Sequence, residues 1–276
     1  MTNLFKPSHL KELCKKYDLT PSKKYGQNYL ISDAPIQKMI NAAQIQKGER
    51  VVEIGPGFGV LTFGLLERGA QVTAFEIERK LESYWEDNSH DNLEIVWGNA
   101  LTQIMEHGTL SNSKYKVVAN LPYQITSHVL RTLLELEDKP ESITVMVQKE
   151  VADRIVAKPG DMSVLAASVQ YYGDPKVVCK VPRGNFWPEQ KVDSAIIHIE
   201  INSHELKDIE FDKKFFEVVR AGFANKRKQL WRNLSVGLKI DKDTVQNTLK
   251  ELFGNEKIRA QELGIEEWIS IVKKLT

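Results

Sequence analysis

The 276-residue sequence contains only two cysteines, Cys14 and Cys179. Two cysteines are too few for a disulfide framework or a cysteine-rich zinc site, so we expect no structural metal. The sequence also lacks the run of about 20 apolar residues that a membrane-spanning helix needs. Its first twenty residues include four lysines and no apolar segment, so we expect no signal peptide. These absences predict a cytoplasmic protein that has no membrane anchor and binds no metal.

The chain also lacks an excess of charge of one sign, since 38 basic residues balance 37 acidic ones. The basic residues nevertheless gather in two clusters. Residues 1–30 contain six lysines, and residues 220–239 contain six basic residues and no acidic one. Such clusters are common on solvated helix faces, but interleaved aromatic residues such as Trp231 also favour nucleic-acid binding. The candidate nucleic-acid contacts are Lys23, Lys24, Arg220, Lys226, Arg227, Lys228 and Arg232.

Short β-branched runs alternate with amphipathic segments along the first two thirds of the chain. The strand-like runs fall at 50–54, 71–77, 93–97, 115–119, 142–148, 177–181 and 194–201. Apolar residues recur at helical spacing near 59–68, 78–87, 125–137 and 163–172. Alternation of this kind predicts βαβ units that build a doubly wound, mostly parallel sheet with helices on both faces.

The pattern changes near residue 205. Beyond this point only helical periodicity remains, over 212–224, 243–252 and 265–274. We therefore expect an α/β domain over 1–204, which includes the basic segment 1–30, and a small all-α domain over 205–276.

A glycine-rich turn follows the first strand-like run of the α/β domain. Residues 53–59 read Glu-Ile-Gly-Pro-Gly-Phe-Gly. Glycines let the backbone turn tightly and let a ligand lie against it without meeting a Cβ, although ordinary strand–helix turns also use them. Glu76 ends the next strand-like run, where a carboxylate can accept both hydroxyls of an adenosine ribose. Together, Gly55, Gly57 and Glu76 predict a nucleoside cofactor.

Val60 helps to distinguish between such cofactors. The dinucleotide fingerprint requires a small residue at this position, because the helix packs closely on the strand there. A bulky valine disfavours NAD and suits S-adenosylmethionine, which has no pyrophosphate to hold. Glu53 can then reach the cationic amino-acid end of the cofactor, although a polar residue at a strand end needs no such role.

The sequence Asn120-Leu121-Pro122-Tyr123 follows another strand-like run, at the sheet edge where ligands of open α/β sheets bind. An exocyclic adenine amine is a poor nucleophile because its lone pair is delocalised into the ring. The Asn120 side-chain oxygen and the Leu121 carbonyl could accept its two hydrogens and free that lone pair, since a residue before proline is extended. Tyr123 offers a ring on which the base can stack. The alternative is that Asn120 only caps the helix that begins near Thr126.

Taken together, these motifs resemble the small-subunit ribosomal RNA adenine dimethyltransferases, the kasugamycin-sensitivity methyltransferases, and their macrolide-resistance relatives. The resemblance extends from about residue 19 to residue 234. The matching segments are 23–30, 51–62, Glu76, 120–123, 147–154 and 223–230.

The resemblance implies a Rossmann-like class I methyltransferase fold and S-adenosylmethionine as cofactor. It implies that Asn28, Leu30, Asn99 and Asn120 contact the cofactor. It also implies that the Phe186 side chain closes over the target base. The implied reaction is N6-dimethylation of two adjacent adenosines near the 3′ end of small-subunit rRNA during ribosome biogenesis. We expect a monomer that acts on rRNA within a ribosomal subunit or its precursor, bound through the two basic clusters.

Three residues depart from the family pattern. Asn99 stands where the family usually has aspartate, so one acceptor for the cofactor's adenine amine loses its charge. Gln190 replaces the second proline of a Phe-x-Pro-x-Pro loop, which predicts a less rigid loop. Asn225 stands where the family often has arginine or glutamine, which removes one basic contact.

Two other functions remain open at this stage. One is a resistance methyltransferase that acts on large-subunit rRNA, although Leu121 and residues 148–154 favour the dimethyltransferases. The other is a catalytically idle ribosome-assembly or transcription factor of the same fold, for which Asn99 is the only indication.

Overall fold

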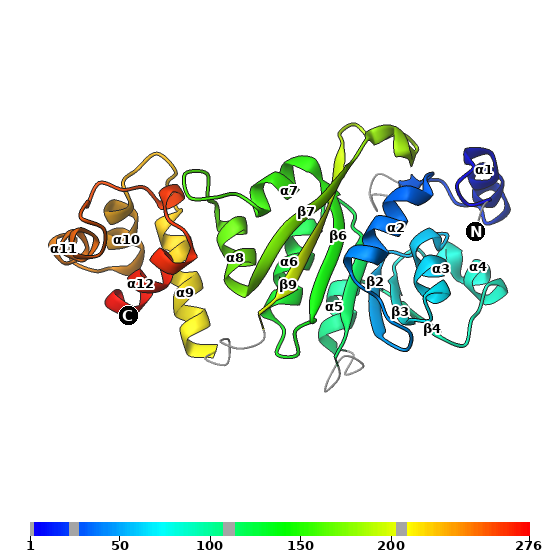
Figure 1. Ribbon diagram of the computed structural model, residues 1–276, viewed down its shortest axis with the longest axis horizontal. Helices are drawn as coiled ribbons and strands as arrows, with labels where there is room; N and C mark the ends of the chain where they lie inside the picture. The colour runs from blue at the N-terminus through cyan, green and yellow to red at the C-terminus, as the bar shows by residue number, and fades with distance from the viewer. Residues whose placement is uncertain (1–2, 22–27, 107–113, 203–208) are drawn as a thin grey trace. The chain divides into compact units, whose positions relative to one another are not determined.

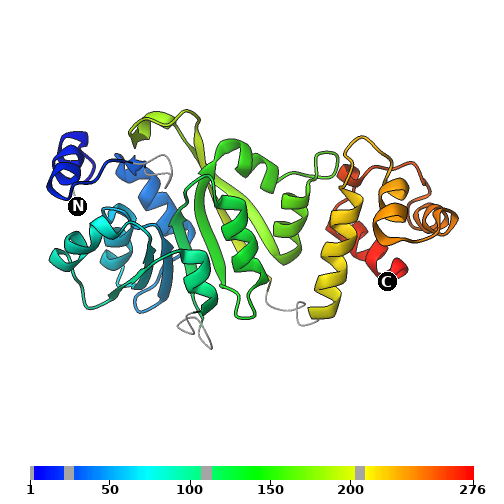
Figure 2. The same ribbon diagram turned by 180° about the vertical axis from the view of Figure 1, so that it is seen from behind.

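The computed structural model describes residues 3–21, 28–106, 114–202 and 209–276, with the side chains of residues 105 and 106 left aside. The chain forms two compact units (Figures 1 and 2). Unit 1 comprises residues 1–152 and 175–201, and unit 2 comprises residues 153–174 and 202–276.

Unit 1 is built on a sheet that has seven strands within the described residues, in the order β4-β3-β2-β5-β6-β9-β7. The strands are β2 (Arg50–Ile54), β3 (Gln71–Glu76), β4 (Leu93–Trp97), β5 (Lys116–Asn120), β6 (Ser142–Gln148), β7 (Gly173–Val181) and β9 (Ser194–Ile201). Strands β2 to β6 pair in parallel, whereas β9 runs antiparallel to β6 and places Ser194 opposite Gln148. The predicted mostly parallel sheet is therefore confirmed.

Helices cover both faces of this sheet. The helices of unit 1 are α1 (Pro7–Lys16), α2 (Asp33–Ala42), α3 (Val60–Glu67), α4 (Glu82–Asp87), α5 (Ala100–Glu106) and α6 (Thr126–Glu135), with 3-10 turns at η1 (Arg79–Leu81) and η3 (Arg183–Asn185). Helix α7 (Lys149–Ile155) begins in unit 1 and ends in unit 2. Helices α2 and α3 lie on one face, and α5 and α6 lie on the other (Figures 1 and 2). Six of the eight residues of α3 are buried, because this helix packs between the sheet and other helices.

A two-residue ladder joins segments that are far apart in the sequence. Strand β1 (Tyr29–Leu30) pairs antiparallel with β8 (Phe186–Trp187), with Tyr29 opposite Trp187 and Leu30 opposite Phe186. The Tyr29 ring also lies 5.0 Å from the ring of Phe58, centroid to centroid. The ladder therefore brings the segment after residue 27 and the segment before residue 191 to the same edge of unit 1.

Unit 2 is helical. It contains α8 (Val164–Tyr172), α9 (Ile209–Gly222), α10 (Leu230–Leu238), α11 (Lys242–Phe253) and α12 (Ile265–Leu275), with a 3-10 turn at η4 (Ala260–Glu262). Trp268 of α12 is fully buried, and a Cβ at Gly222 of α9 would overlap its ring, so only glycine allows these helices to pack so closely.

Helix α8 clusters with the helical unit rather than with the α/β unit, in which the sequence pattern placed it. The Tyr171 ring stacks on Phe215 at 3.9 Å between centroids, and its hydroxyl donates to Asp212 at 2.7 Å. This packing against α9 is a tertiary contact, and local periodicity does not reveal it. The boundary near residue 205 stays a prediction for the folding domains.

The described residues lack two features that would point to other partners. None of the helices found there is both long and apolar enough to cross a membrane. No group of three or more His, Cys, Asp or Glu side chains in these residues could hold a metal ion.

Candidate active site

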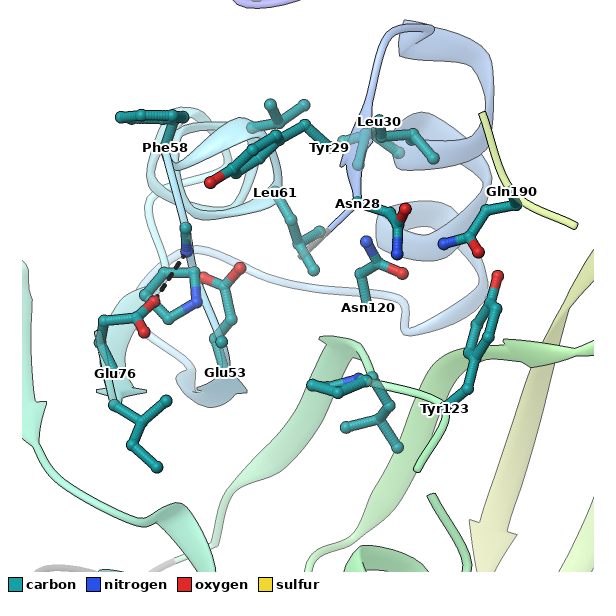
Figure 3. A pocket seen from close by; sticks show the side chains of 18 residues that line it. Asn28, Tyr29, Leu30, Glu53, Phe58, Leu61, Glu76, Asn120, Tyr123 and Gln190 are labelled. Atoms are coloured by element: carbon teal, nitrogen blue, oxygen red, sulfur yellow. Dashed lines mark hydrogen bonds between the residues drawn. The ribbon is translucent and has the colours of Figure 1, made fainter. Parts of the chain in front are cut away.

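A pocket opens at the carboxyl ends of the parallel strands of unit 1 (Figure 3). Its lining includes residues 28–30, the glycine turn at 55–58, residues 120–123 and Gln190. Glu53 and Glu76 lie at one end of it, while Asn28, Asn120 and Gln190 gather at the other, beside Tyr123 (Figure 3). The fold thus joins the predicted cofactor residues of the glycine turn and the predicted catalytic residues of 120–123 in one pocket.

The glycine turn has backbone conformations that favour glycine. Gly55, Gly57 and Gly59 have φ angles of +73°, +56° and +81°. A Cβ on Gly59 would lie 2.7 Å from the Phe63 ring and 2.8 Å from the Trp85 ring, so this glycine is required for packing. A Cβ on Gly55 would meet no atom within 4 Å, so that the backbone faces open space. The turn therefore presents bare backbone to a ligand at Gly55.

Glu76 joins the glycine turn to β3. Its Oε2 accepts the Gly57 N–H at 3.1 Å, and its Oε1 accepts the Glu78 N–H at 2.8 Å. Burial raises the pKa of Glu76, and hydrogen bonds from the backbone of Glu78 and Gly57 oppose that rise. These bonds hold the carboxylate on the pocket wall, where a ribose would meet it.

Glu53 is a second buried carboxyl group of the pocket, and its pKa is strongly raised. Its side chain is 2% exposed, and its Oε2 has no hydrogen-bond partner among the described residues. Burial is the main cause that raises its pKa to about 8; the Thr62 side chain opposes this rise, and the nearby Glu76 carboxylate adds to it. A buried acceptor without a partner is costly, and a cationic ligand group would both pair with it and stabilise its ionised form.

These features fit S-adenosylmethionine. Glu76 offers acceptors for ribose hydroxyls, Glu53 offers an unpaired acceptor for an ammonium group, and the bare turn at Gly55 admits a ligand between them. Leu30 adds an apolar wall, and Asn28 lines the same pocket.

Asn120 is the last residue of β5. The next residue, Leu121, is still held against β6, because its N–H donates to the Met146 carbonyl at 3.2 Å. Asn120 is half-buried and lines the pocket, and its side-chain amide forms no hydrogen bond within the described residues. The alternative role as a helix cap is wrong, since the N-cap of α6 is Ile125 and no side chain caps it. The Asn120 amide is therefore available to a ligand.

Tyr123 has a partner that the sequence motifs did not indicate. Its hydroxyl lies 2.5 Å from the Oγ of Ser194, a fully buried residue at the start of β9. The two residues are 71 positions apart, so only the pairing of β9 with β6 could have revealed this contact. Burial raises the pKa of Tyr123, and its hydroxyl therefore stays protonated near neutral pH. Ser194 fixes the direction of the Tyr123 ring along the pocket.

Two expected site residues lie outside the pocket lining. Phe186 is 3% exposed and packs in the core, because its pairing with Leu30 turns its side chain inward. It presents no face to a base in this structure, and its stacking role stays a prediction. Asn99 is exposed, and its Oδ1 accepts the Leu101 N–H at 3.0 Å, so it caps the start of α5. Its contact with the cofactor also stays a prediction.

The basic residues of unit 2 are exposed. Arg220 lies in the last turn of α9, and residues 226–228 lie between α9 and α10. None of these side chains forms an ion pair within the described residues. The Arg232 guanidinium lies 5.0 Å from the centre of the Trp231 ring. Phe223, by contrast, is half-buried and packs against the ring of Trp268. Lys23 and Lys24 lie outside the described residues.

Asn233 holds the connection between α9 and α10 in place. Its Nδ2 donates to the carbonyl oxygens of Gly222 at 2.6 Å and Asn225 at 3.1 Å. The cations at 226–228 are therefore carried by a connection that is anchored at its beginning.

Comparison with known proteins shows the family of the chain. Residues 19–276 match the family model described as ribosomal RNA adenine dimethylase. A relative from Dehalococcoides mccartyi, ribosomal RNA small subunit methyltransferase A, is 42% identical over 260 residues, which cover 94% of this chain and 89% of the relative. The protein of that name from Clostridioides difficile is 38% identical over 275 residues, 97% of this chain and 95% of the relative.

Solved structures show the same fold. A dimethyladenosine transferase from Plasmodium falciparum is similar with a TM-score of 0.72 and 25% identity, over 88% of this chain and 95% of that one. The 23S rRNA methyltransferase ErmE is similar with a TM-score of 0.70 and 26% identity, over 89% of this chain and 98% of that one. The chain therefore belongs to the ribosomal RNA adenine dimethylase family.

Proposed function

We propose that this protein uses S-adenosylmethionine to dimethylate N6 of two adjacent adenosines near the 3′ end of small-subunit rRNA. The observation that carries the proposal is the pocket itself. It places the unpaired amide of Asn120 in the same cavity as the carboxyl groups of Glu53 and Glu76. A cofactor held by the two carboxylates would lie beside a base held at Asn120.

The residues of the chain would act mainly through positioning. S-adenosylmethionine, when bound, supplies an electrophilic methyl group. The Asn120 Oδ1 and the Leu121 carbonyl would each accept a hydrogen bond from the target amine, and these bonds would localise the lone pair on its nitrogen. The Tyr123 ring, directed by Ser194, would stack on the base. Holding two reactants in line, rather than a general base, supplies most of the rate. As the N–C bond forms and the S–C bond of the cofactor breaks, the nitrogen becomes cationic and releases its proton to water.

The target base must leave its stack to reach this pocket, which costs a few kcal/mol unless a loop already exposes it. Stacking on Tyr123 would offset about 1–3 kcal/mol of that cost. The exposed cations of unit 2, Arg220, residues 226–228 and Arg232, would hold the RNA backbone, with Lys23 and Lys24 as further contacts. We expect the substrate to be rRNA within a ribosomal subunit or its precursor, and the enzyme to be a cytoplasmic monomer.

Methyl incorporation into unmethylated ribosomal subunits tests this proposal. We expect label from S-adenosylmethionine in the small subunit, recovered as N6,N6-dimethyladenosine, and none in the large subunit. An Asn120→Ala variant is the control, because it should bind cofactor within a few-fold of the unmodified protein and yet fail to transfer methyl groups. Label in the large subunit would instead assign a resistance-type activity. Absence of label from both subunits would favour an assembly factor.

A further inference from the structure

Gln190 occupies a position that the reaction described so far does not use. The family has a proline there, and this chain has a side chain with two N–H donors and a carbonyl acceptor. Gln190 is half-buried and lines the pocket, and its amide forms no hydrogen bond within the described residues. A polar group that lines a pocket without a partner in the protein is available to a ligand.

The loop that carries Gln190 is held on both sides despite the loss of the proline. Strand β8 pairs with β1 before it, and β9 pairs with β6 after it. Within the loop, the Arg183 N–H donates to Asp193 Oδ1 at 3.0 Å, and the Arg183 Nε lies 3.1 Å from Glu189 Oε1. These contacts anchor the backbone from which the Gln190 side chain starts, and the expectation of a less rigid loop stays a prediction.

The neighbours of Gln190 are the residues proposed to hold the target base. Figure 3 shows its amide beside the hydroxyl end of the Tyr123 ring, with the nitrogen directed toward Asn28 and Asn120. The Tyr123 hydroxyl already has Ser194 as its partner. Gln190 is therefore not needed to position the ring, and its donors face the space where a base stacked on Tyr123 would lie.

The chemistry of adenine matches this arrangement. Its amine would donate two hydrogen bonds, one to Asn120 and one to Leu121. The two ring nitrogens that flank the amine, N1 and N7, then remain as acceptors. We propose, on the basis of the proposed function, that Gln190 donates a hydrogen bond to one of these two ring nitrogens and thereby orients the target base on Tyr123. A bond to N1 would also select adenine, because guanine carries a hydrogen at N1, whereas N7 is an acceptor in both bases. Proline has no N–H and could make no such contact.

Base analogues separate this role from a structural one. The test uses small subunits whose rRNA carries 1-deazaadenosine or 7-deazaadenosine at the target position, introduced by ligation of a synthetic 3′ segment. It compares the unmodified protein with a Gln190→Met variant, which keeps the size of the side chain and removes its donors. Glu189→Ala is the matched control, since Glu189 is exposed and does not line the pocket.

We expect Gln190→Met to slow methylation of normal adenosine by about tenfold, as for the loss of one hydrogen bond. For one of the two analogues, the methylation rate relative to normal adenosine should fall about tenfold further in the unmodified protein and in Glu189→Ala than in Gln190→Met. This comparison cancels the intrinsic reactivity of the analogue, because each analogue is its own reference in the two proteins.

Equal sensitivity of the unmodified protein and Gln190→Met to both analogues would overturn the inference. So would a loss in Gln190→Met that Glu189→Ala reproduces, because that loss would reflect the shape of the loop alone. A failure of the proposed function is distinguishable from either result, since the unmodified protein would then leave normal adenosine in the small subunit unmethylated.

Discussion

Replacing Glu53 by glutamine should make the cofactor-free protein more stable, by an amount that grows with pH. The buried carboxyl has an ordinary pKa of 4.5 in the unfolded chain and a pKa of about 8 in the fold. Between these two values the folded state binds more protons than the unfolded state. The free energy of unfolding therefore falls by about 1.4 kcal/mol per pH unit in this window because of Glu53 alone. Glutamine has the same shape and does not titrate.

Urea denaturation of both proteins without cofactor measures this difference. Between pH 6 and pH 7.5 the stability advantage of Glu53→Gln should increase by about 2 kcal/mol, and above pH 8 it should stop increasing. Because the free energy of unfolding of each protein is compared with that of the other at the same pH, the contributions of all other titrating groups cancel. Parallel curves for the two proteins over this range would show that Glu53 is ionised in the fold and would refute the reasoning.

The cofactor provides the second half of the test. An ammonium group beside Glu53 stabilises the carboxylate, so binding at pH 7 should expel close to one proton from the carboxyl group. Calorimetry in buffers of different ionisation enthalpy counts this proton. Glu53→Gln should release none and should bind S-adenosylmethionine more weakly. Equal proton release by both proteins would place the ammonium group elsewhere.

Three further predictions follow from the other site residues. Ser194→Ala should lower kcat several-fold with little change in KM, and Tyr123→Phe should add little to it, because both remove the same hydrogen bond; additive losses would contradict this coupling. Reversing the cations at 226–228 to glutamate should weaken RNA binding by orders of magnitude and reduce the log–log salt slope by about three, while cofactor affinity, a property of unit 1, stays unchanged. The control reverses three exposed lysines elsewhere in unit 2, Lys250, Lys257 and Lys273, and equal losses in both triple variants would show a non-specific charge effect. Asn99→Asp should keep the cap on α5 and tighten cofactor binding a few-fold in a calorimetric titration; an unchanged affinity would leave Asn99 as a cap only.

Local patterns predicted much of the sheet. Strands β2 and β9 match their predicted ranges, because each is an apolar run with clear limits. Strand β7 begins at Gly173 instead of residue 177, since its first residues include Pro175 and lack the apolar character of a buried strand. An edge strand tolerates such residues, because one side of it needs no ladder partner. The antiparallel insertion of β9 between β6 and β7 depends on tertiary pairing and has no local signal.

The candidate site divides in the same way. Glu53, Glu76 and Asn120 were predictable because each is the last or second-to-last residue of a strand, and the ends of parallel strands meet at one edge. The partner of Tyr123 was not predictable, because Ser194 is distant in sequence and unremarkable in type. Motif resemblance assigned Phe186 to the target base, but a motif does not tell which way a strand residue faces, and pairing with Leu30 turned this one into the core.

The ladder between β1 and β8 has a consequence for the synthesis of the protein. Leu30 and Phe186 pair across 156 positions of the chain, so the rim that carries Asn28 has no partner until β8 has been made. At a translation rate of about 5–20 residues per second, that interval lasts roughly 8–30 s. Gln190 is added only after β8. A growing chain can assemble the central strands and the glycine turn in this time, yet it lacks a closed pocket. Tight cofactor binding is therefore acquired late, and it marks a chain whose first unit is complete.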